Sequence, residues 1–219
     1  MISTIKPGYL RLISELERRV APHFSSHHLD YYSGKYPWAG SITNHKPECQ
    51  VLAFDPRWDT ETWRTQSRRM AMKVLHALEA LGAERKKDPN PNYTWTSDLN
   101  VVKGKAPFTS ASAFFKFNTQ LEKLFEGVLP LLAAEGVLSV IDYDLVGMSQ
   151  EEFLTRFRAQ AELDEIRTFG FEEAYRTYTR VGLENCIQIG EAHGLKTIER
   201  ERFLGQYFIW VGANHSERK

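Results

Sequence analysis

The most constraining stretch of this sequence is the apolar run at residues 137–141 (VLSVI), which begins directly after Gly136. A short, continuous apolar run of this kind is typical of a strand whose two faces are both buried. Such strands occur in parallel sheets that are covered by helices on both sides. The run therefore favours an α/β protein.

Amphipathic helices and further strands alternate around this run. Helices are predicted at residues 8–20, 60–81, 121–132, 149–161, 171–180 and 183–193. Strands are predicted at residues 51–54, 99–102, 195–202 and 206–212, and the first two are expected beside 137–141 as buried parallel neighbours. The short connection between the last two makes them an antiparallel pair. The alternation predicts a three-layer, Rossmann-like α/β fold: a mostly parallel sheet with helices on both faces and a C-terminal antiparallel hairpin.

Residues 21–49 interrupt this alternation, because periodicity is lost there and aromatic and turn residues gather. We expect an irregular segment that folds over the strand ends as a lid, since its aromatic content is too high for a disordered tail. The chain is then a single domain, with the N-terminal helix and lid in residues 1–50 and the sheet core in residues 51–219. Tyr36 and Trp38 of the lid are candidate substrate-binding residues, although they could equally cap the core.

Composition narrows the classes of partner. The 219 residues carry 28 Lys and Arg against 28 Asp and Glu, so the formal net charge is zero. Proteins that bind nucleic acid or anionic membranes usually carry a basic excess, so nucleic acid is not indicated, while a protein partner stays open. No apolar run approaches the roughly 20 residues of a membrane span, and the N-terminus lacks the apolar segment of a signal peptide. With only two cysteines, we expect a cytoplasmic protein.

Several stretches of the second half resemble the closing half of class I S-adenosylmethionine-dependent methyltransferases. Residues 129–142 look like the helix that leads into the fifth strand of that family, and residues 149–180 are similar to a helical insertion after it. Residues 191–199 and 206–212 look like the last helix and the reversed final hairpin. The resemblance implies a Rossmann-like fold, S-adenosylmethionine as cofactor and transfer of a methyl group to an acceptor that the sequence does not identify.

The resemblance also implies where the cofactor would bind. Members of the family place a glycine-rich turn after the first strand and an acid at the end of the second strand, where it holds ribose hydroxyls. Asp55, which follows the predicted strand at 51–54, corresponds to that acid by position. Gly34 and Gly40 are the candidates for the turn, but no predicted strand precedes either of them.

Two carboxylates follow the strongest predicted strand, and they keep two other functions open. Ligands of open α/β sheets collect beyond the carboxyl ends of the strands, so Asp142 and Asp144 are candidate residues for binding a small-molecule substrate in a strand-end cleft. Their spacing also resembles the metal-holding Asp-x-Asp of nucleotide-sugar glycosyltransferases, which makes a metal-dependent glycosyltransferase one alternative. The other alternative is a non-catalytic binding or regulatory protein on a Rossmann-like scaffold that has lost the cofactor turn.

Histidine and cysteine give weaker indications. His23, His27, His28 and His45 cluster in the sequence, but their spacing is not that of a metal-ligand set, and we expect exposed loop histidines. Cys49 follows His45 by four residues, yet nothing in the sequence supplies the orienting acid that a thiol nucleophile needs. We therefore predict no metal site and no catalytic thiol.

Overall fold

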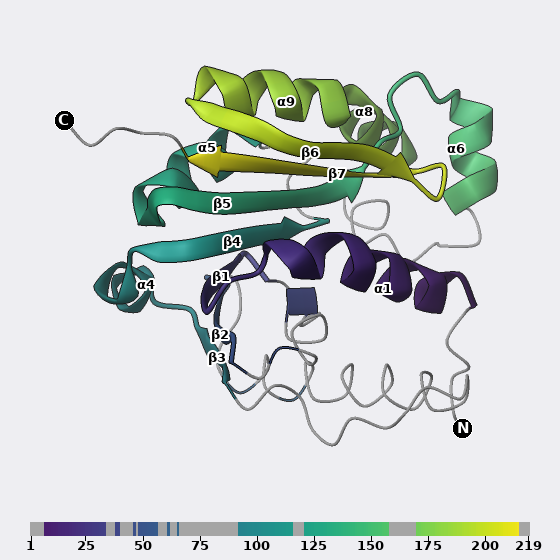
Figure 1. The fold of residues 1–219 in the computed structure, drawn as a ribbon. Helices are drawn as coiled ribbons and strands as arrows, with labels where there is room; N and C mark the ends of the chain where they lie inside the picture. The colour runs from purple at the N-terminus through teal and green to yellow at the C-terminus, as the bar shows by residue number, and fades with distance from the viewer. Residues whose placement is uncertain are drawn as a thin grey trace.

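The computed structural model describes residues 7–33, 38–39, 46, 48–56, 61, 65, 92–115, 121–157 and 170–214. Within these residues a seven-stranded sheet has helices on both faces (Figure 1). Helix α1 (Pro7–Val20) covers one face, while α5 (Leu121–Val128) and α9 (Leu183–Ala192) cover the other. This is the three-layer α/β fold that the sequence predicts. No helix of the described ranges is long and apolar enough to cross a membrane.

The strands lie in the order β3-β2-β1-β4-β5-β7-β6. Their bounds are β1 (His27–Tyr31), β2 (Gln50–Phe54), β3 (Tyr93–Thr96), β4 (Phe108–Phe114), β5 (Leu132–Tyr143), β6 (Leu195–Phe203) and β7 (Tyr207–Asn214). The first five are parallel, and β7 runs antiparallel to both β5 and β6. The chain winds outward from β1 to β3 and then restarts at β4 on the other side of β1. The direction of winding therefore reverses between β1 and β4.

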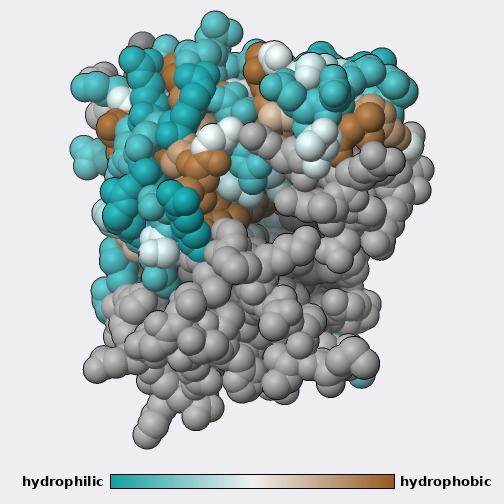
Figure 2. Space-filling view, turned by 90° about the vertical axis from the view of Figure 1, so that its right-hand side faces the viewer, coloured by the Kyte–Doolittle hydropathy of each residue, from teal (hydrophilic) through white to brown (hydrophobic). Residues whose placement is uncertain are grey.

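The carboxyl ends of the parallel strands meet at one edge of the sheet. Figure 2 looks onto this edge from the right of Figure 1, the side to which the arrowhead of β4 points. Hydrophobic surface gathers there in a recess near the middle of the face. In open α/β sheets ligands bind outside the carboxyl ends, at the point where the winding reverses. This edge is therefore where a binding site is expected.

The second half folds largely as predicted, except that the helix predicted at residues 121–132 ends as α5 at Val128 and β5 begins at Leu132. The capping box at the start of α6 (Gln150–Phe157) is present: Glu152 N–H donates to Ser149 Oγ at 3.2 Å, and Ser149 N–H donates to Glu152 Oε2 at 2.9 Å. Helices α8 (Phe171–Arg180) and α9 follow. The hairpin of β6 and β7 turns through Leu204 and Gly205, whose φ angles of 51° and 67° are left-handed, and β6 forms the edge of the sheet.

Residues 27–31 require the main correction. They form β1, a central strand of the sheet, and not part of an irregular lid. The sheet therefore takes strands from both sides of the boundary that the sequence suggests at residue 50. His28 and Asp30 make this segment look too polar for a central strand, but both side chains are buried. The polar partners that make this burial tolerable for His28 come from β4, far away in the sequence.

A second correction concerns Leu99–Lys105, which forms helix α4 and not the predicted strand. Asp98 caps this helix, because its carboxylate accepts the backbone N–H two residues on at 2.8 Å. Only Val102 of the apolar run is buried, whereas Leu99 and Val101 are exposed. A stretch of four residues with three apolar ones is too short to show whether its period is that of a helix or of a strand.

The prediction that residues 51–54 lie beside residues 137–141 is also wrong, because β1 and β4 separate β2 from β5. β4 (Phe108–Phe114) lies in a segment that reads as a loop, and it separates β1 from β5. Its serines at positions 110 and 112 alternate with apolar residues that face the other side. The segment therefore lacks the continuous apolar run that marks β5. Of the helix predicted at residues 60–81, only Glu61 and Thr65 lie within the described ranges, and both are helical.

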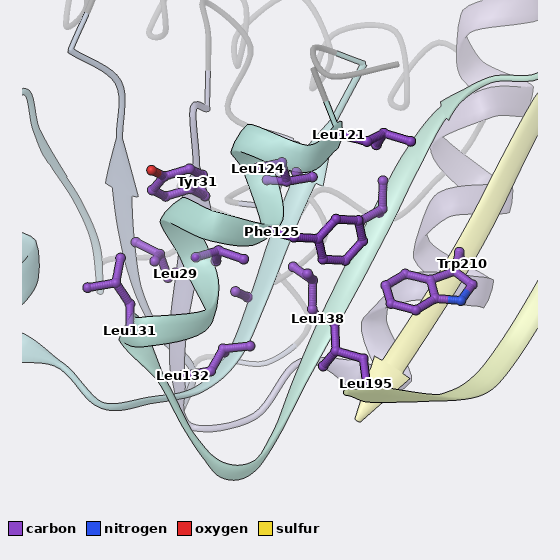
Figure 3. Packing of buried hydrophobic residues seen from close by; sticks show 14 of the residues in the cluster. Leu29, Tyr31, Leu121, Leu124, Phe125, Leu131, Leu132, Leu138, Leu195 and Trp210 are labelled. Atoms are coloured by element: carbon purple, nitrogen blue, oxygen red, sulfur yellow. The ribbon is translucent and has the colours of Figure 1, made fainter. Parts of the chain in front are cut away.

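Two large apolar clusters form the core, one on each face of the sheet. Figure 3 shows the cluster between the sheet and α5, where Phe125, Leu138 and Trp210 meet. The ring of Trp210 packs edge-on against Phe125 with centroids 5.4 Å apart, and its Nε1 donates to Thr197 Oγ1 at 2.9 Å. Each such buried side chain contributes about 1.5–3 kcal/mol. The cluster on the other face lies under α1 and includes Leu16.

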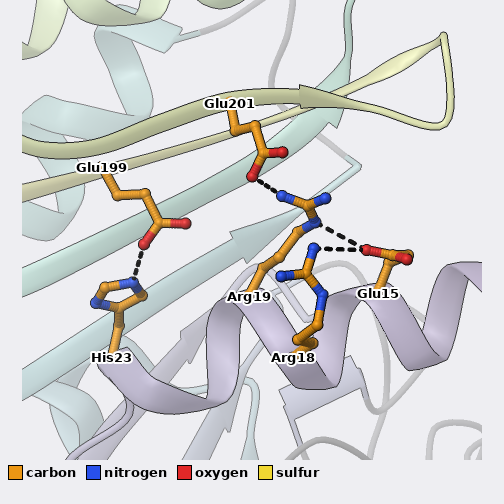
Figure 4. A network of polar contacts seen from close by, with 6 residues as sticks. All are labelled: Glu15, Arg18, Arg19, His23, Glu199 and Glu201. Atoms are coloured by element: carbon orange, nitrogen blue, oxygen red, sulfur yellow. Dashed lines mark hydrogen bonds and ion pairs between the residues drawn. The ribbon is translucent and has the colours of Figure 1, made fainter.

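Charged side chains hold the C-terminal half of α1 against the edge strand β6 (Figure 4). Arg19 pairs with Glu201 of β6 and, at 3.0 Å, with Glu15 one turn earlier in the helix. His23 Nε2 lies 2.7 Å from Glu199 Oε2. The side chain of Arg19 is only 10% exposed, so solvent screens these pairs less than ordinary surface pairs. They join the beginning of the chain to its last hairpin.

Candidate functional site

Two buried carboxyl groups lie at the strand ends where the winding reverses. Asp30 is the penultimate residue of β1, and Asp55 directly follows β2. Their exposed fractions are 1% and 0%. They are close enough for the negative charge of Asp55 to act on Asp30. We call these two residues the acid pair.

Among the described residues, Asp30 lacks the partners that a buried carboxyl group normally has. Neither of its side-chain oxygens makes a hydrogen bond to any described residue. Burial raises the pKa of Asp30 well above its usual range, and the charge of Asp55 raises it further. The Ala39 backbone N–H and the Ser112 hydroxyl lower this pKa, although neither meets hydrogen-bond geometry. A positively charged or hydrogen-bond-donating ligand group would satisfy this carboxyl group.

Ser33 and Tyr93 add polar groups beside Asp30. Ser33 follows β1, and its backbone N–H donates to Phe54 O at 3.0 Å, which ties this turn to β2. Its hydroxyl is buried and, within the described part of the chain, has no hydrogen-bond partner. Burial raises the pKa of Tyr93 well above its usual range, and the charge of Asp30 contributes to this rise. The ends of β1 and β2 thus meet in a buried polar cluster that offers groups to a ligand.

His28 lies in the polar interior behind this cluster. Its Nδ1 is 2.8 Å from Ser110 Oγ, its Nε2 is 2.8 Å from Ser112 Oγ, and its ring stacks on Phe24 with centroids 3.8 Å apart. Burial lowers the pKa of His28 to about 3, because it disfavours the charged ring. The neutral ring therefore fixes the hydroxyl of Ser112, which lies next to Asp30.

The other described histidines of this segment have separate partners. His23 faces Glu199, and His27 Nε2 is 2.8 Å from Lys105 O. Among the described residues no group of three potential ligands could hold a metal ion. His28 is not the exposed loop residue that the sequence suggests, since it is fully buried in a strand.

Each of the two strands that flank the reversal ends in an aromatic residue with a left-handed backbone. Tyr32 follows β1 with φ 54°, and Phe115 follows β4 with φ 51°. Bulky residues rarely adopt this region, and such strain is found preferentially at functional sites. Phe115 is held there by its N–H, which donates to Ile141 O of β5 at 2.8 Å. The strain therefore lies at the same edge as the acid pair.

Of the three candidate cofactor residues, the structure describes Asp55 but not the two glycines. Asp55 lies at the end of a buried strand, as its sequence position predicts. Gly34 and Gly40 lie outside the described residues. Gly34 nevertheless follows Tyr31, the last residue of β1, by three positions, so the strand that the sequence analysis could not find does precede it. The position of Gly34 after β1 is therefore compatible with a cofactor turn.

Of the candidate substrate residues that the structure describes, Trp38 and Asp142 lie on different faces of the sheet. Tyr36 lies outside the described ranges. Trp38 is buried near the end of β4, with its ring centroid 5.2 Å from that of Phe115. Asp142 accepts from Tyr143 N–H at 2.7 Å and lies on the α9 face, where its charge adds to the raised pKa of the buried Cys186. It therefore lies on the opposite side of the sheet from Asp30.

Asp144 and Cys49 have structural partners. Asp144 forms an ion pair with Arg202 of β6, so the two carboxylates of the Asp-x-Asp sequence have different environments. Cys49 Sγ donates to Ser25 O at 2.9 Å, and burial raises the pKa of Cys49 to about 11. A thiol with this pKa is protonated near neutral pH and is a poor nucleophile.

Sequence reasoning missed Asp30, Ser33 and His28. One signal for them was available: in residues 27–31 (HHLDY) the polar side chains at 28 and 30 alternate with apolar ones at 29 and 31. This is the period of a strand, and Ser33 and Gly34 follow it as turn residues. The polar half of the pattern points to the α1 face, which in most sheets would be apolar.

Comparison with known proteins identifies solved structures that share this fold. No family model matches the chain, and no curated protein sequence matches it. An O-methyltransferase family protein from Burkholderia thailandensis superposes with a TM-score of 0.58 at 12% identity, over 94% of this chain and 56% of that one. This chain has the fold of a methyltransferase. It spans little more than half the length of that protein.

Two further solved structures match this chain over more of their own length. The geranyl diphosphate C-methyltransferase from Streptomyces coelicolor A3(2) gives a TM-score of 0.53 at 11% identity, over 93% of this chain and 80% of that one. The magnesium protoporphyrin IX methyltransferase from Synechocystis PCC 6803 gives 0.51 at 12%, over 96% and 85%. The first contains S-adenosyl-L-homocysteine and the second contains bound SAH. The methyltransferase-type, Rossmann-like fold thus includes the first half of the chain and not only its second half.

Proposed function

We propose that this protein binds S-adenosylmethionine at the carboxyl ends of β1 and β2 and transfers its methyl group to a small-molecule acceptor. The observation that carries the proposal is the acid pair: two buried carboxyl groups at the reversal of winding, one of them with no hydrogen-bond partner among the described residues. Solved structures with this fold hold S-adenosyl-L-homocysteine or SAH, which supports the choice of cofactor.

The residues present fit the groups of this cofactor. A carboxylate at the end of β2 can accept hydrogen bonds from two ribose hydroxyls, which is the role we propose for Asp55. Asp30 would accept from the positively charged amino group, which supplies both the charge and the donors that this site lacks. Gly34 stands where the chain leaves β1, and we propose that the turn there approaches the cofactor. When bound, S-adenosylmethionine supplies a methyl group on a positively charged sulfur.

The alternative of a metal-dependent glycosyltransferase has no support in the described residues. Its two carboxylates, Asp142 and Asp144, contact different partners, and no metal-binding group of three occurs there. We further propose that the protein acts in the cytoplasm, because the chain has only two cysteines, both buried in different parts of the fold, and needs no oxidising compartment.

A calorimetric titration with S-adenosylmethionine tests the proposal. Asp55→Asn keeps the shape of the side chain but weakens its bonds to ribose hydroxyls. Charge-assisted hydrogen bonds contribute on the order of 1.5–3 kcal/mol each, so the affinity should fall about tenfold or more. Asp142→Asn is the matched control, since it also replaces a buried carboxylate near a strand end but lies on the other face of the sheet. The affinity of Asp142→Asn for S-adenosylmethionine should stay within about twofold of that of the wild type.

Two results would count against the proposal. No binding of S-adenosylmethionine by the folded wild-type protein would leave the non-catalytic scaffold as the better account. An equal loss of affinity in Asp55→Asn and Asp142→Asn would show that the acid pair is not the binding site.

A further inference from the structure

Aromatic rings from four separate segments meet at the carboxyl ends of β4 and β5. They belong to Trp38, Phe115, Tyr143 and Tyr207, which we call the ring cluster. The centroid of Phe115 lies 5.2 Å from that of Trp38, 5.7 Å from that of Tyr143 and 5.5 Å from that of Tyr207. The rings of Tyr143 and Tyr207 are 5.2 Å apart. Phe115 therefore stands at the centre of the cluster.

The ring cluster lies beside the acid pair. Phe115 follows β4, and β4 is the strand next to β1, with Ser112 of β4 paired to Asp30 of β1. Phe115, Tyr143 and Tyr207 are only half-buried, and Figure 2 shows hydrophobic surface in a recess on this edge of the molecule. A ligand bound by the acid pair would thus have the ring cluster on the β4 side.

The position of Phe115 adds an independent indication. A phenylalanine at φ 51° is strained, and a glycine or asparagine would fit this backbone with less strain. Neighbouring rings support the cluster from outside: Tyr178 packs edge-on against Tyr143 at 5.5 Å, and Phe203 packs against Tyr207 at 5.6 Å. A strained aromatic residue held in place by further rings is what a preorganised binding wall requires.

We propose that the ring cluster binds the methyl acceptor and that the acceptor is a flat, uncharged aromatic small molecule. Aromatic rings favour offset-stacked and edge-to-face contacts with other rings, and a wall of several rings offers both. The four side chains of the cluster carry no formal charge, so they favour an uncharged acceptor over a phosphorylated one. This inference rests on the proposed function, because it assigns the second substrate of the same site.

Binding of 2-naphthol, a flat bicyclic aromatic probe, tests the inference in the presence of S-adenosylhomocysteine. Its saturated counterpart 2-decalol has a similar size and one hydroxyl group but no aromatic π electrons. Saturation-transfer NMR should give a dissociation constant for 2-naphthol that is about threefold to tenfold lower than that for 2-decalol. Phe115→Leu keeps apolar bulk and should abolish this preference. Phe171→Leu is the control, because its ring lies between α6 and α8 at 5.7 Å from Phe153.

The outcomes separate this inference from the proposed function. Equal affinity for the two probes, no binding of 2-naphthol, or an unchanged preference in Phe115→Leu would overturn the aromatic acceptor. Loss of the preference in Phe171→Leu to the same extent would also overturn it. A titration of the same variants with S-adenosylmethionine alone reports on the proposed function, and Phe115→Leu should change that affinity less than about twofold.

Discussion

The α1 face of the sheet consists of two regions that are equally buried but chemically different. On β5 and β7 this face carries mainly apolar side chains, such as Ile141, Ile209 and Val211, with the buried Ser139 as a polar exception. On β1 and β4 it carries His28, Asp30 and two serines. An apolar region can be satisfied by packing alone, whereas the polar region leaves a buried carboxyl group without a partner among the described residues. The difference indicates that β5 and β7 mainly stabilise the fold and that β1 and β4 serve a ligand.

The largest effect is expected from truncation in the apolar region. Ile209→Ala should lower the free energy of unfolding by about 2–5 kcal/mol, the range for large-to-small changes of Leu, Ile and Met in a core. The Ile209 side chain is fully buried among the apolar residues on the α1 face. Urea denaturation measures the loss, and Ile209→Val should lose only about 0.5–1.5 kcal/mol. A loss below about 1 kcal/mol in Ile209→Ala would contradict the assignment of this region to stability.

The polar region should show itself in the pH dependence of stability, with a smaller effect. The pKa of His28 is lowered to about 3 in the folded protein, against about 6.5 when unfolded. Its contribution is therefore complete above pH 6.5 and is lost as the pH falls, by about 2 kcal/mol at pH 5. The pKa of Asp30 is raised, so its contribution has the opposite sign and grows as the pH falls through its folded pKa.

Single substitutions separate the two groups. His28→Gln removes the acid-induced loss, so its unfolding free energy should fall less than that of the wild type between pH 7 and pH 5. Asp30→Asn removes the opposing gain, so its unfolding free energy should fall at least as steeply as that of the wild type. Urea denaturation at pH 7, 6 and 5 compares the slopes. Identical slopes in the wild type and His28→Gln would show that the buried ring does not titrate as its surroundings imply.

The same contrast explains how far the fold could be predicted from the sequence. A continuous apolar run and local turn chemistry identify β5, the capping box at Ser149 and the final hairpin, because these signals lie within one segment. β1 and β4 carry no such run, and the alternation in residues 27–31 indicates a strand but not one buried on both faces. Their polar residues are compatible with burial only because His28 meets Ser110 and Ser112 across the sheet. That pairing joins positions about 80 residues apart and is invisible to local periodicity.

The site was predictable to a similar degree. Asp55 could be placed because it follows an apolar strand, which marks a strand end directly. Asp30 could not, since its role depends on recognising residues 27–31 as a strand. Asp142 and Asp144 follow the clearest strand of the chain, yet one faces α9 and the other pairs with Arg202. A strand end is therefore a candidate site, but the side of the sheet has to come from the structure.

The smallest effect is expected where the two ends of the chain meet, at α1 and β6. Arg19→Met should lower the free energy of unfolding by about 1 kcal/mol, because it removes the partly buried pairs with Glu15 and Glu201. Arg18→Met is the matched control: this side chain is 63% exposed, so the loss should stay below about 0.5 kcal/mol. The difference between the two variants should shrink in 1 M salt. Equal losses would show that this junction contributes no more than ordinary surface pairs.

Amide hydrogen exchange on the wild-type protein tests the central claim most directly, because it locates the ligand without any substitution. Exchange is measured with and without saturating S-adenosylmethionine, and peptides are compared along the chain. We predict slower exchange at the ends of β1 and β2, around Ser33 and Asp55, and no change in the hairpin of β6 and β7. Slowing confined to that hairpin or to the end of β5, or no slowing anywhere, would contradict the assignment of the polar region to a ligand.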